Sequence, residues 1–341
     1  MDTRTGRIAR EYSRQEFLSL GIAAAGAGLM FAGCSASDAA GGGGGSEADK
    51  LRITYQPGTT TYAQLVIMEQ EGWLADDLQD VDISWNQVDA GAAVRDAIAS
   101  GKTDIGAGGI GPFLVGYDSG IDWRILSALD NVSMWLMVKD EKFKSLKDFK
   151  EGDKIAVVAP DSIQAVILRK GAQEQLGDPH ALDGNMISLP SPDSVTALLN
   201  GQVAAHFTAP PFQFQEQDKG ARPILKSFDL FGEHNLISLW VLRDFHEANP
   251  KIMSAVYKNV QKATKLIQDD PNRAGEILAK VSKIDPAEET RYLTEQGVSF
   301  TTTPRGFISF AKFMKTADLI KKVPGSWKDL VYDNIKNSDG S

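Results

Sequence analysis

The chain has 341 residues, with 36 lysines and arginines against 45 aspartates and glutamates, so its formal net charge is −9. An acidic chain without a basic stripe is poorly suited to hold nucleic acid or anionic lipid by charge, because both require clustered cationic side chains. A single cysteine excludes disulfides within the chain, thiolate metal clusters and dithiol redox pairs.

Residues 1–33 follow the order of an export signal. Four arginines come first, the apolar stretch from Phe17 to Met30 follows, and small residues end the segment. The tetrapeptide Phe31-Ala32-Gly33-Cys34 resembles a bacterial lipobox, in which a peptidase cuts before the cysteine and the thiol carries a diacylglycerol. We therefore expect lipidation of Cys34, because a buried core cysteine would not precede a long polar run.

Residues 34–49 are predicted to form a flexible tether after the lipidated cysteine, since they contain five consecutive glycines and no large apolar residue. Two acyl chains hold a protein stably on a membrane. We expect an extracytoplasmic protein that is lipid-anchored to the cell membrane, on its periplasmic side or at the cell surface. The segment 13–18 resembles a twin-arginine export motif with Gln15 in place of the second arginine, so the export route stays open.

Strand-like and helix-like segments alternate from Leu51 onward. The predicted strands and helices of this first part are Leu51–Tyr55, Tyr62–Glu71, Val81–Trp85, Ala92–Ser100 and Asp104–Ala107. The same order returns with Lys154–Val158, Ser162–Gln175, Met186–Leu189, Pro192–Asn200 and Ala204–Phe207. Such a rhythm predicts parallel sheets covered on both faces, and its repetition predicts two similar α/β lobes in succession.

Two apolar segments, Ser133–Val138 and Leu236–Leu242, look like strands outside this rhythm and are candidates for the crossings between the lobes. The rest of the chain is predicted to be helical, in the segments Pro250–Gln268, Pro271–Lys280, Pro286–Gln296 and Phe307–Lys321. We expect these helices to pack back on the first lobe.

Several short segments in a fixed order carry a family resemblance: Leu51–Tyr62, Glu71-Gly72-Trp73, Ala97–Gly106, Lys144–Phe149 leading into Lys154–Val157, and Ala197–Val203. Together they resemble the solute-binding proteins of bacterial ABC importers, from the group that includes nitrate, sulfonate, taurine and thiamine-precursor binders. The resemblance covers nearly all of residues 50–341.

The resemblance implies a periplasmic-binding-protein fold of type II, with two α/β lobes joined by two crossing strands. Lobe I would comprise residues 50–134 and 238–341, and lobe II residues 135–237. It also implies a small solute held between the lobes, and a permease and an ATPase as partners. By default we expect a monomer, with neither a cofactor nor a metal.

Ligands of parallel α/β sheets bind beyond the carboxyl ends of the strands, where loops lead into helix N-termini. This rule, applied to six loops, selects Gln56, Thr59, Thr60, Tyr62, Gly109, Ile110, Gly111, Asn131, Asp161, Ser162, Gln164, Thr208, Phe212, His234 and Asn235 as candidate ligand-binding residues. Helix caps and turns explain many of the same residues. His206 is expected to be a core histidine.

None of these six loops contains Lys or Arg. A nitrate or sulfonate would therefore be held by helix N-termini and hydroxyl groups instead of a bidentate arginine. A neutral or cationic heteroaromatic solute such as a pyrimidine is the alternative, because aromatic residues (Tyr62, Phe113, Trp135, Phe212) and acids (Asp130, Asp161, Glu233) are near the predicted cleft. Large apolar residues are commonly core residues instead.

Catalysis is disfavoured by the motifs that the chain lacks. The four histidines, at positions 180, 206, 234 and 246, have no metal-site spacing, and no serine elbow or carboxylate pair stands out. We expect a binder that captures a solute, closes around it and delivers it to a permease. A protein that presents a ligand to a sensor remains the alternative.

Overall fold

The computed structural model describes residues 47–58 and 60–341, which belong to one compact unit. The predicted export signal, Cys34, the tether up to residue 46, and Thr59 lie outside the described residues. Among the described helices, none combines the length and the apolar character that crossing a membrane requires.

The first of two five-stranded sheets has the order β2-β1-β3-β11-β4. Its strands are β1 (Lys50–Tyr55), β2 (Asp82–Gln87), β3 (Ile105–Gly109), β4 (Trp123–Ala128) and β11 (Ile237–Leu242). As predicted, β1 runs parallel to both β2 and β3. The inserted strand β11 is antiparallel to its neighbours β3 and β4, so the sheet is mixed.

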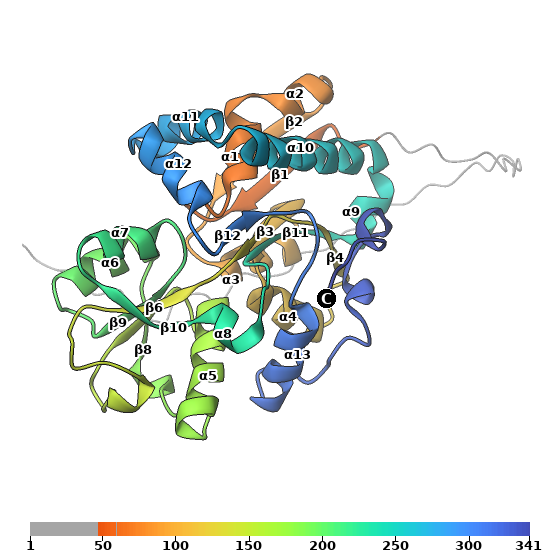
Figure 1. Ribbon diagram of the computed structural model, residues 1–341. Helices are drawn as coiled ribbons and strands as arrows, with labels where there is room; N and C mark the ends of the chain where they lie inside the picture. Colours follow the sequence, from red (N-terminus) through yellow and green to blue (C-terminus); the bar gives the residue numbers. More distant parts are fainter. Residues whose placement is uncertain (1–46, 59) are drawn as a thin grey trace, which may run out of the picture. The chain divides into compact units, whose positions relative to one another are not determined.

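Four helices connect the strands of this sheet: α1 (Ala63–Gln70), α2 (Trp73–Asp77), α3 (Gly91–Ala99) and α4 (Ile110–Asp118). Helix α3 packs against β1 and β3, with Val94 and Ile98 buried. Helix α1 packs against the C-terminal helices α10 (Pro250–Asp269) and α11 (Pro271–Ser282), beside which it lies in Figure 1. The sheet is thereby covered as the sequence rhythm predicts.

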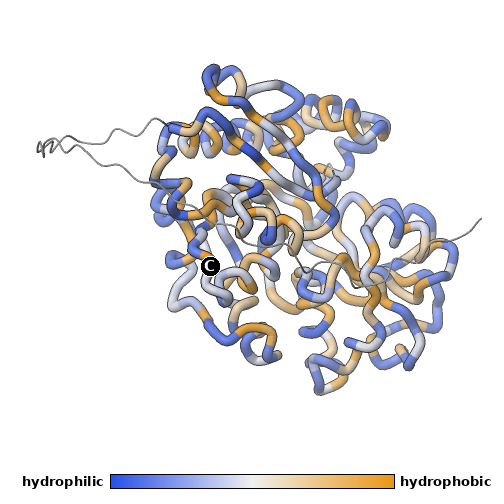
Figure 2. The backbone as a smooth tube through the Cα atoms, turned by 180° about the vertical axis from the view of Figure 1, so that it is seen from behind, coloured by the Kyte–Doolittle hydropathy of each residue, from blue (hydrophilic) through white to orange (hydrophobic). Residues whose placement is uncertain are grey.

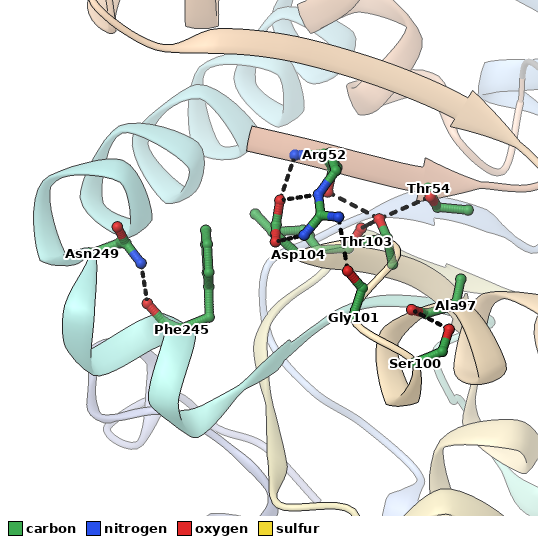
Figure 3. Close-up of polar contacts among 10 residues, drawn as sticks. Arg52, Thr54, Ala97, Ser100, Gly101, Thr103, Asp104, Phe245 and Asn249 are labelled. Carbon is green, nitrogen blue, oxygen red and sulfur yellow. Dashed lines mark hydrogen bonds and ion pairs between the residues drawn. The ribbon is translucent and has the colours of Figure 1, made fainter. Parts of the chain in front are cut away.

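An ion pair explains part of the motif at residues 97–106. Arg52 of β1 donates from its main-chain and side-chain nitrogens to Asp104, and the pair is bidentate with distances of 2.7 to 3.0 Å (Figure 3). The same guanidinium donates to the carbonyl of Gly101 at 2.7 Å. These bonds fix the turn between α3 and β3 at the amino ends of the strands, so Asp104 has a structural role.

The second sheet has the order β10-β6-β9-β7-β8. Its strands are β6 (Trp135–Val138), β7 (Ile155–Val157), β8 (Met186–Ser188), β9 (Ala205–Thr208) and β10 (Arg222–Lys226). Its helices are α5 (Ile163–Leu176), α6 (Ser191–Leu199), α7 (Phe212–Asp218) and α8 (Ser227–Phe231). Strands β7, β8 and β9 are parallel, whereas β6 is antiparallel to β9.

Each of the two segments expected to cross between the lobes is a strand that belongs to one sheet. Segment 133–138 contains β6 of the second sheet, and segment 236–242 contains β11 of the first. The chain passes between the sheets just before these strands, at residues 129–134, which include β5 (Asp130–Val132), and at residues 227–236. The expected crossings are therefore displaced toward the N-terminus by a few residues, while the lobe boundaries themselves stay a prediction.

The C-terminal part consists of α9 (Arg243–Ala248), α10, α11, α12 (Pro286–Thr294), β12 (Val298–Phe300) and α13 (Phe307–Thr316). Helix α10 is strongly amphipathic, and Figure 2 shows orange and blue positions alternating along the helices of this region. Its buried face, including Ile252, Val256 and Val260, packs on α1.

Helix α12 makes contacts beyond the first lobe, on which these helices are expected to pack. Its Tyr292 stacks on Phe214 of α7 with ring centroids 6.0 Å apart. The neighbouring Arg291 pairs with Asp218 at 2.5 Å. Short β12 pairs with β5 in a separate two-stranded sheet. The segment from α12 to β12 therefore contacts the chain between the two five-stranded sheets and the second sheet's helices.

We call the part of the chain built on the first sheet the first half, and the part built on the second sheet the second half. A second contact between the two halves involves His180, which follows α5. Its Nε2 lies 3.0 Å from the carbonyl oxygen of Ala317, the residue that ends α13, and its Nδ1 lies 2.9 Å from Asp183. Asp183 is held in turn by Arg169 of α5 at 2.9 Å. Helix α13 packs on α4 of the first half, so this contact joins the outer parts of both halves.

The end of the predicted tether is bound to the folded part of the chain. The main-chain nitrogen of Ala48 donates to Asn249 at 2.7 Å, and Glu47 accepts from the main-chain nitrogen of Lys251 in the first turn of α10. Residues 47–49, which the sequence assigns to the flexible tether, are thus ordered against α10.

Candidate functional site

A small cavity of about 60 Å³ lies where the carboxyl ends of the strands of both sheets meet. The first half contributes Gln56, Pro57, Thr61, Tyr62, Gly91, Gly109 and Pro112 to its wall. The second half and the connecting chain contribute Val158, Ser162, Ile163, Gln164, Ser191, Ala209, Pro210, Phe212, Leu236 and Ile237. Both halves therefore form the wall of this cavity.

Five helices of eight or more residues begin at this wall: α1, α3, α4, α5 and α6. The wall includes their cap or first residues, for example Tyr62 of α1, Gly91 of α3 and Ser162 of α5. The first main-chain N–H groups of a helix lack intrahelical partners, and the helix dipole places positive potential at this end. The wall contains no Lys or Arg, so its positive potential arises from the backbone alone.

Six of the predicted ligand-binding residues lie on the cavity wall: Gln56, Tyr62, Gly109, Ser162, Gln164 and Phe212. The Tyr62 hydroxyl donates to Gln56 Oε1 at 3.0 Å, and Gln56 Nε2 donates to the carbonyl of Asp89 at 3.3 Å. Ser162 caps α5 by accepting from the Ala165 nitrogen at 3.3 Å. Gln56, Tyr62 and Ser162 are therefore ordered by hydrogen bonds within the protein.

Eight other described candidates lie off the wall: Thr60, Ile110, Gly111, Asn131, Asp161, Thr208, His234 and Asn235. Thr208 is fully buried in β9 and its hydroxyl lies 3.4 Å from the Ala209 carbonyl. Its neighbours Ala209 and Pro210 reach the cavity instead. Whether any of the predicted residues contacts a solute stays a prediction.

Asn131 and Asn235 connect the chain segments between the sheets. Asn235 Nδ2 donates to Asn131 Oδ1 at 2.8 Å, and its Oδ1 accepts from the Arg305 nitrogen at 2.6 Å. His234 is fully buried between Phe228 and Phe310, with Nε2 2.8 Å from the Ser227 hydroxyl. Burial lowers the pKa of His234 to about 4, so this imidazole is neutral and structural.

The other residues named for the cleft occupy several environments. Phe113 stacks on Trp123 in the core, and Trp135 packs edge-on against Phe214. His206 is buried, as expected for a core histidine, and its Nδ1 lies 2.6 Å from Glu216. No group of three or more His, Cys, Asp or Glu in the described part of the chain is placed to hold a metal ion.

The two halves also come into close contact at β3, α4 and the start of α5. A Cβ atom on Gly111 would lie 2.9 Å from the Asp161 carbonyl oxygen, and one on Gly109 would lie 3.1 Å from the Ile163 side chain. Beside this contact, Arg95 of α3 pairs with Asp161 at 2.7 Å. The glycines expected to admit a ligand thus admit the opposite half.

A buried acid lies behind the wall at Leu236 and Ile237. Asp130 is fully buried, and its Oδ1 accepts from the main-chain nitrogens of Leu236 at 2.8 Å and Ile237 at 3.1 Å. Its Oδ2 has no hydrogen-bond partner among the described residues. Burial raises the pKa of Asp130 to about 7, against the two backbone hydrogen bonds that lower it.

The sequence argument named Asp130 only as an acid near the cleft and missed several wall residues, including Pro57, Thr61, Gly91 and Ser191. Gly91 and Ser191 are the first residues of α3 and α6. The rule that selected the other loops applies to these two helix starts as well, so extending it to every strand-to-helix junction would have found them.

The family follows from a sequence model whose description is the NMT1-like family. It matches residues 44–281, which is more than half of the chain. The chain belongs to the NMT1-like family. The family resemblance noted in the sequence is thereby confirmed. No curated protein sequence matches this NMT1-like chain.

Among solved structures, this NMT1-like chain is similar to the alkanesulfonate-binding protein SsuA from Xanthomonas axonopodis pv. citri bound to MOPS. The two are 21% identical with a TM-score of 0.69, over 82% of this chain and 96% of that one. The periplasmic nitrate-binding protein NrtA from Synechocystis PCC 6803 is 15% identical with a TM-score of 0.68, over 85% and 86%.

A conserved Candida albicans gene product, described as having the generic periplasmic binding protein structural fold, is 13% identical with a TM-score of 0.64, over 86% of this chain and 99% of that one. At these identities the likeness shows the fold. The predicted two-lobed periplasmic-binding-protein fold of the NMT1-like chain is therefore confirmed.

The approach of α5 to Gly111 yields a first prediction. Gly111→Ala places a methyl group against the backbone of residues 161–163, so the halves must separate slightly and any solute that needs their closure binds at least fivefold more weakly. Isothermal titration measures this change, with a solute first identified by screening small compounds for a rise in the melting temperature of the protein. Gly184→Ala is the matched control, because a Cβ there meets nothing within 4 Å. Equal affinity of both variants would contradict the assigned contact.

Asp130 yields a second prediction, for the solute-free protein. Its carboxyl keeps a proton up to about pH 7 in the folded state but loses it near pH 3.9 when unfolded. Between these values the folded state binds more protons, so the free energy of unfolding falls as pH rises, by up to about 1.4 kcal/mol per pH unit. Above pH 7 the contribution of Asp130 to the free energy of unfolding no longer changes with pH.

Asp130→Asn removes this titration while keeping an acceptor for the two main-chain nitrogens. We expect its urea unfolding free energy to depend less on pH between 5 and 7 than that of the unaltered protein. Parallel profiles for the two proteins would show that Asp130 is ionised in the fold, contrary to the prediction.

Proposed function

We propose that this protein is the solute-binding component of an ABC importer, and that it holds the oxyanion group of a small solute in the cavity between its lobes. The observation that carries the proposal is the convergence of five helix N-termini on a cavity without cationic side chains. Backbone N–H groups at helix N-termini bind anions without a Lys or Arg. Membership of the NMT1-like family supports the proposal.

The similar structures support an anionic solute by analogy, since their names state alkanesulfonate and nitrate binding. A heteroaromatic solute such as a pyrimidine is the second candidate. The presence of Tyr62 and Phe212 on the wall favours it, because aromatic rings stack on flat ring systems.

Capture requires separation and closure of the lobes around the chain segments that join them. Closure would bring the start of α5 against Gly111 and form the pair of Arg95 with Asp161. Hinge closure around a ligand is an established motion for two-lobed binders. We infer that the closed form delivers the solute to a separate permease powered by ATPase subunits, and that this chain acts without catalysis of its own. A protein that presents the solute to a sensor would use the same closure.

The third prediction tests solute capture. Ethanesulfonate or nitrate should raise the melting temperature of the protein, because a ligand that binds only the folded state stabilises it. Phe212→Ala should weaken the binding at least fivefold, since Phe212 is on the wall. Phe245→Ala is the matched control, with a half-buried phenylalanine of α9 outside the wall.

A panel of sulfonates, nitrate, amines and pyrimidines without any shift in melting temperature would refute solute capture by this protein. Binding of pyrimidines alone would replace the first candidate by the second.

Membrane attachment through Cys34 completes the proposed function. The order of basic residues, apolar run, small residues and Cys34 supports export and lipidation. A lipid-anchored binder stays near its permease, whereas a free binder would diffuse away from it. The proposed location is the extracytoplasmic face of the cell membrane, and the proposed mature form is a monomer.

The fourth prediction concerns this anchor. The full-length chain expressed in a bacterium should sediment with membranes and incorporate a labelled fatty acid. Cys34→Ser should lose the label and appear mostly in the soluble fraction, because two acyl chains provide the attachment. Soluble unaltered protein without label would argue against the anchor while leaving the solute site untouched.

A further inference from the structure

The carboxyl group of Asp130 lies within range of the charge of a solute in the cavity. Its Oδ1 accepts from the main-chain nitrogens of Leu236 and Ile237, and both of these residues form part of the wall. Burial, and then the charge of Asp130, raise the pKa of Tyr62, which is another wall residue. The acid is therefore directly behind the wall of the proposed oxyanion site.

The position of Asp130 is fixed by both connections between the two sheets. The residue belongs to β5 in the first connection, and its carboxyl group is bonded to Leu236 and Ile237 where the second connection ends. Its main-chain carbonyl also accepts from Nδ2 of Asn235. Because both connections hold it, the carboxyl group cannot move away from a solute that enters the cavity.

The segments packed around Asp130 provide no cation to balance a carboxylate. These segments are β12, which pairs with β5 at Asp130, helix α1 with its cap, and residues 233–237 with the chain that they bind at residue 305. Among the described residues, no ion pair joins Asp130 to any group of these segments, and burial keeps the imidazole of His234 neutral by lowering its pKa to about 4. The titratable residues of these segments are Tyr62, Glu69, Glu233, His234 and Arg305.

A proton is the compensation that remains for this buried acid. Asp130 is completely buried, and its Oδ2 has no hydrogen-bond partner among the described residues. An unpaired charge in the interior is costly, whereas a protonated carboxyl group is neutral. In agreement with this geometry, burial raises the pKa of Asp130 to about 7, against the two backbone hydrogen bonds that lower it. The solute-free protein therefore gains or loses this proton near neutral pH.

An anion in the cavity and an ionised Asp130 repel each other. A nearby like charge favours the uncharged form of a titratable group, and the low dielectric of the interior strengthens this effect. The helix N-termini attract the anion in both protonation states of Asp130. The charge of Asp130 therefore decides how the affinity for an anion depends on pH.

We propose that binding of an oxyanion in the cavity is coupled to the uptake of one proton by Asp130, so that the affinity falls as the solution becomes more alkaline. This inference rests on the proposed function and adds a control by pH to the same site. Asp130 acts through its charge, from behind the wall formed by Tyr62, Leu236 and Ile237. The affinity is highest at pH values where Asp130 is protonated before the solute arrives.

Isothermal titration with ethanesulfonate or nitrate tests this coupling, because neither probe gains or loses a proton between pH 5 and pH 9. For the unaltered protein, the dissociation constant should rise at least tenfold from pH 5.5 to pH 9. At pH 7.5 the binding enthalpy should differ between Tris and triethanolamine buffers, which contain no oxyanion and differ in ionisation enthalpy. The difference should correspond to the uptake of about half a proton, as expected when binding raises the pKa by about one unit across this pH.

Asp130→Asn removes the charge while keeping an acceptor for the two main-chain nitrogens. The dissociation constant of this variant should change less than threefold over the same pH range, without proton uptake. At pH 9 the variant should bind the probe more tightly than the unaltered protein, a gain that mere damage to the fold would not produce. A melting curve establishes that the variant is folded.

A second measurement needs no substitution. Infrared difference spectra of the unaltered protein at pH 8 should gain the band of a protonated carboxyl group when ethanesulfonate binds. This measurement identifies the group that takes up the proton as an acid even where Asp130→Asn fails to fold.

Two control variants exclude other sources of the proton. Glu216 is also fully buried, but it pairs with His206 in the second half and lies off the cavity wall. His180 lies in the contact between the two halves, and its bond to Asp183 raises its pKa. Glu216→Gln and His180→Gln should both keep the pH dependence and the proton uptake of the unaltered protein.

The outcomes separate the coupling from the proposed function. Binding that is independent of pH, or proton uptake that persists in Asp130→Asn, would overturn the role of Asp130 while leaving the oxyanion site in place. Loss of the proton uptake in His180→Gln or Glu216→Gln would overturn it as well, by assigning the proton to that residue. Absence of binding by both probes at every pH would refute the proposed oxyanion site itself, and the coupling with it.

Discussion

The structure depends on the close approach of the α5 N-terminus to the backbone at Gly109 and Gly111. This contact sets how near the carboxyl ends of the two sheets can come, and hence the size of the cavity between them. Main-chain atoms of residues 161–163 occupy the space that a side chain at Gly111 would need. Backbone atoms cannot move aside as a flexible side chain can. The distance between Gly111 and residues 161–163 is therefore narrowly fixed when the two halves are in contact.

The same contact explains why helix starts and not charged side chains form the wall. Each parallel strand delivers its following helix with the N-terminus toward the strand's carboxyl end, so facing two such sheets toward each other brings several helix starts together. Arg95 of α3 lies beside the contact with α5, and its charge is paired with that of Asp161. The electrostatic character of the cavity is therefore a property of the topology, modified by one buried acid.

Much of the fold was predictable because its signals are local. The alternation in Leu51–Tyr55, the apolar spacing in α10 and the prolines at the first positions of α10, α11 and α12 each specify an element from neighbouring residues. The neighbouring strands of β6 and β11 were not predictable in this way. An apolar strand has the same sequence pattern whether it crosses between two sheets or belongs to one of them.

The candidate site was predictable at the level of loops but less so at the level of side chains. Successive residues of a strand point to opposite faces, so a displacement of one position separates Thr208, which is buried, from Ala209, which is on the wall. Asp161 is paired with a residue 66 positions away, Arg95, and no local pattern indicates such a partner. Asp130 acquires its unusual environment from Leu236 and Ile237, which are likewise distant in the sequence.

The contact of His180 has a consequence for the protonation of the folded protein. Both of its partners, the Asp183 carboxylate and the Ala317 carbonyl, accept hydrogen bonds, and an imidazole ring has two N–H donors only as a cation. The bond to Asp183 raises the pKa of His180, and the C-terminal end of α13 favours positive charge. The contact is complete at pH below the ordinary histidine pKa and loses one donor as pH rises through the raised value. The two halves are thus held together in part by a proton that His180 takes from the solvent.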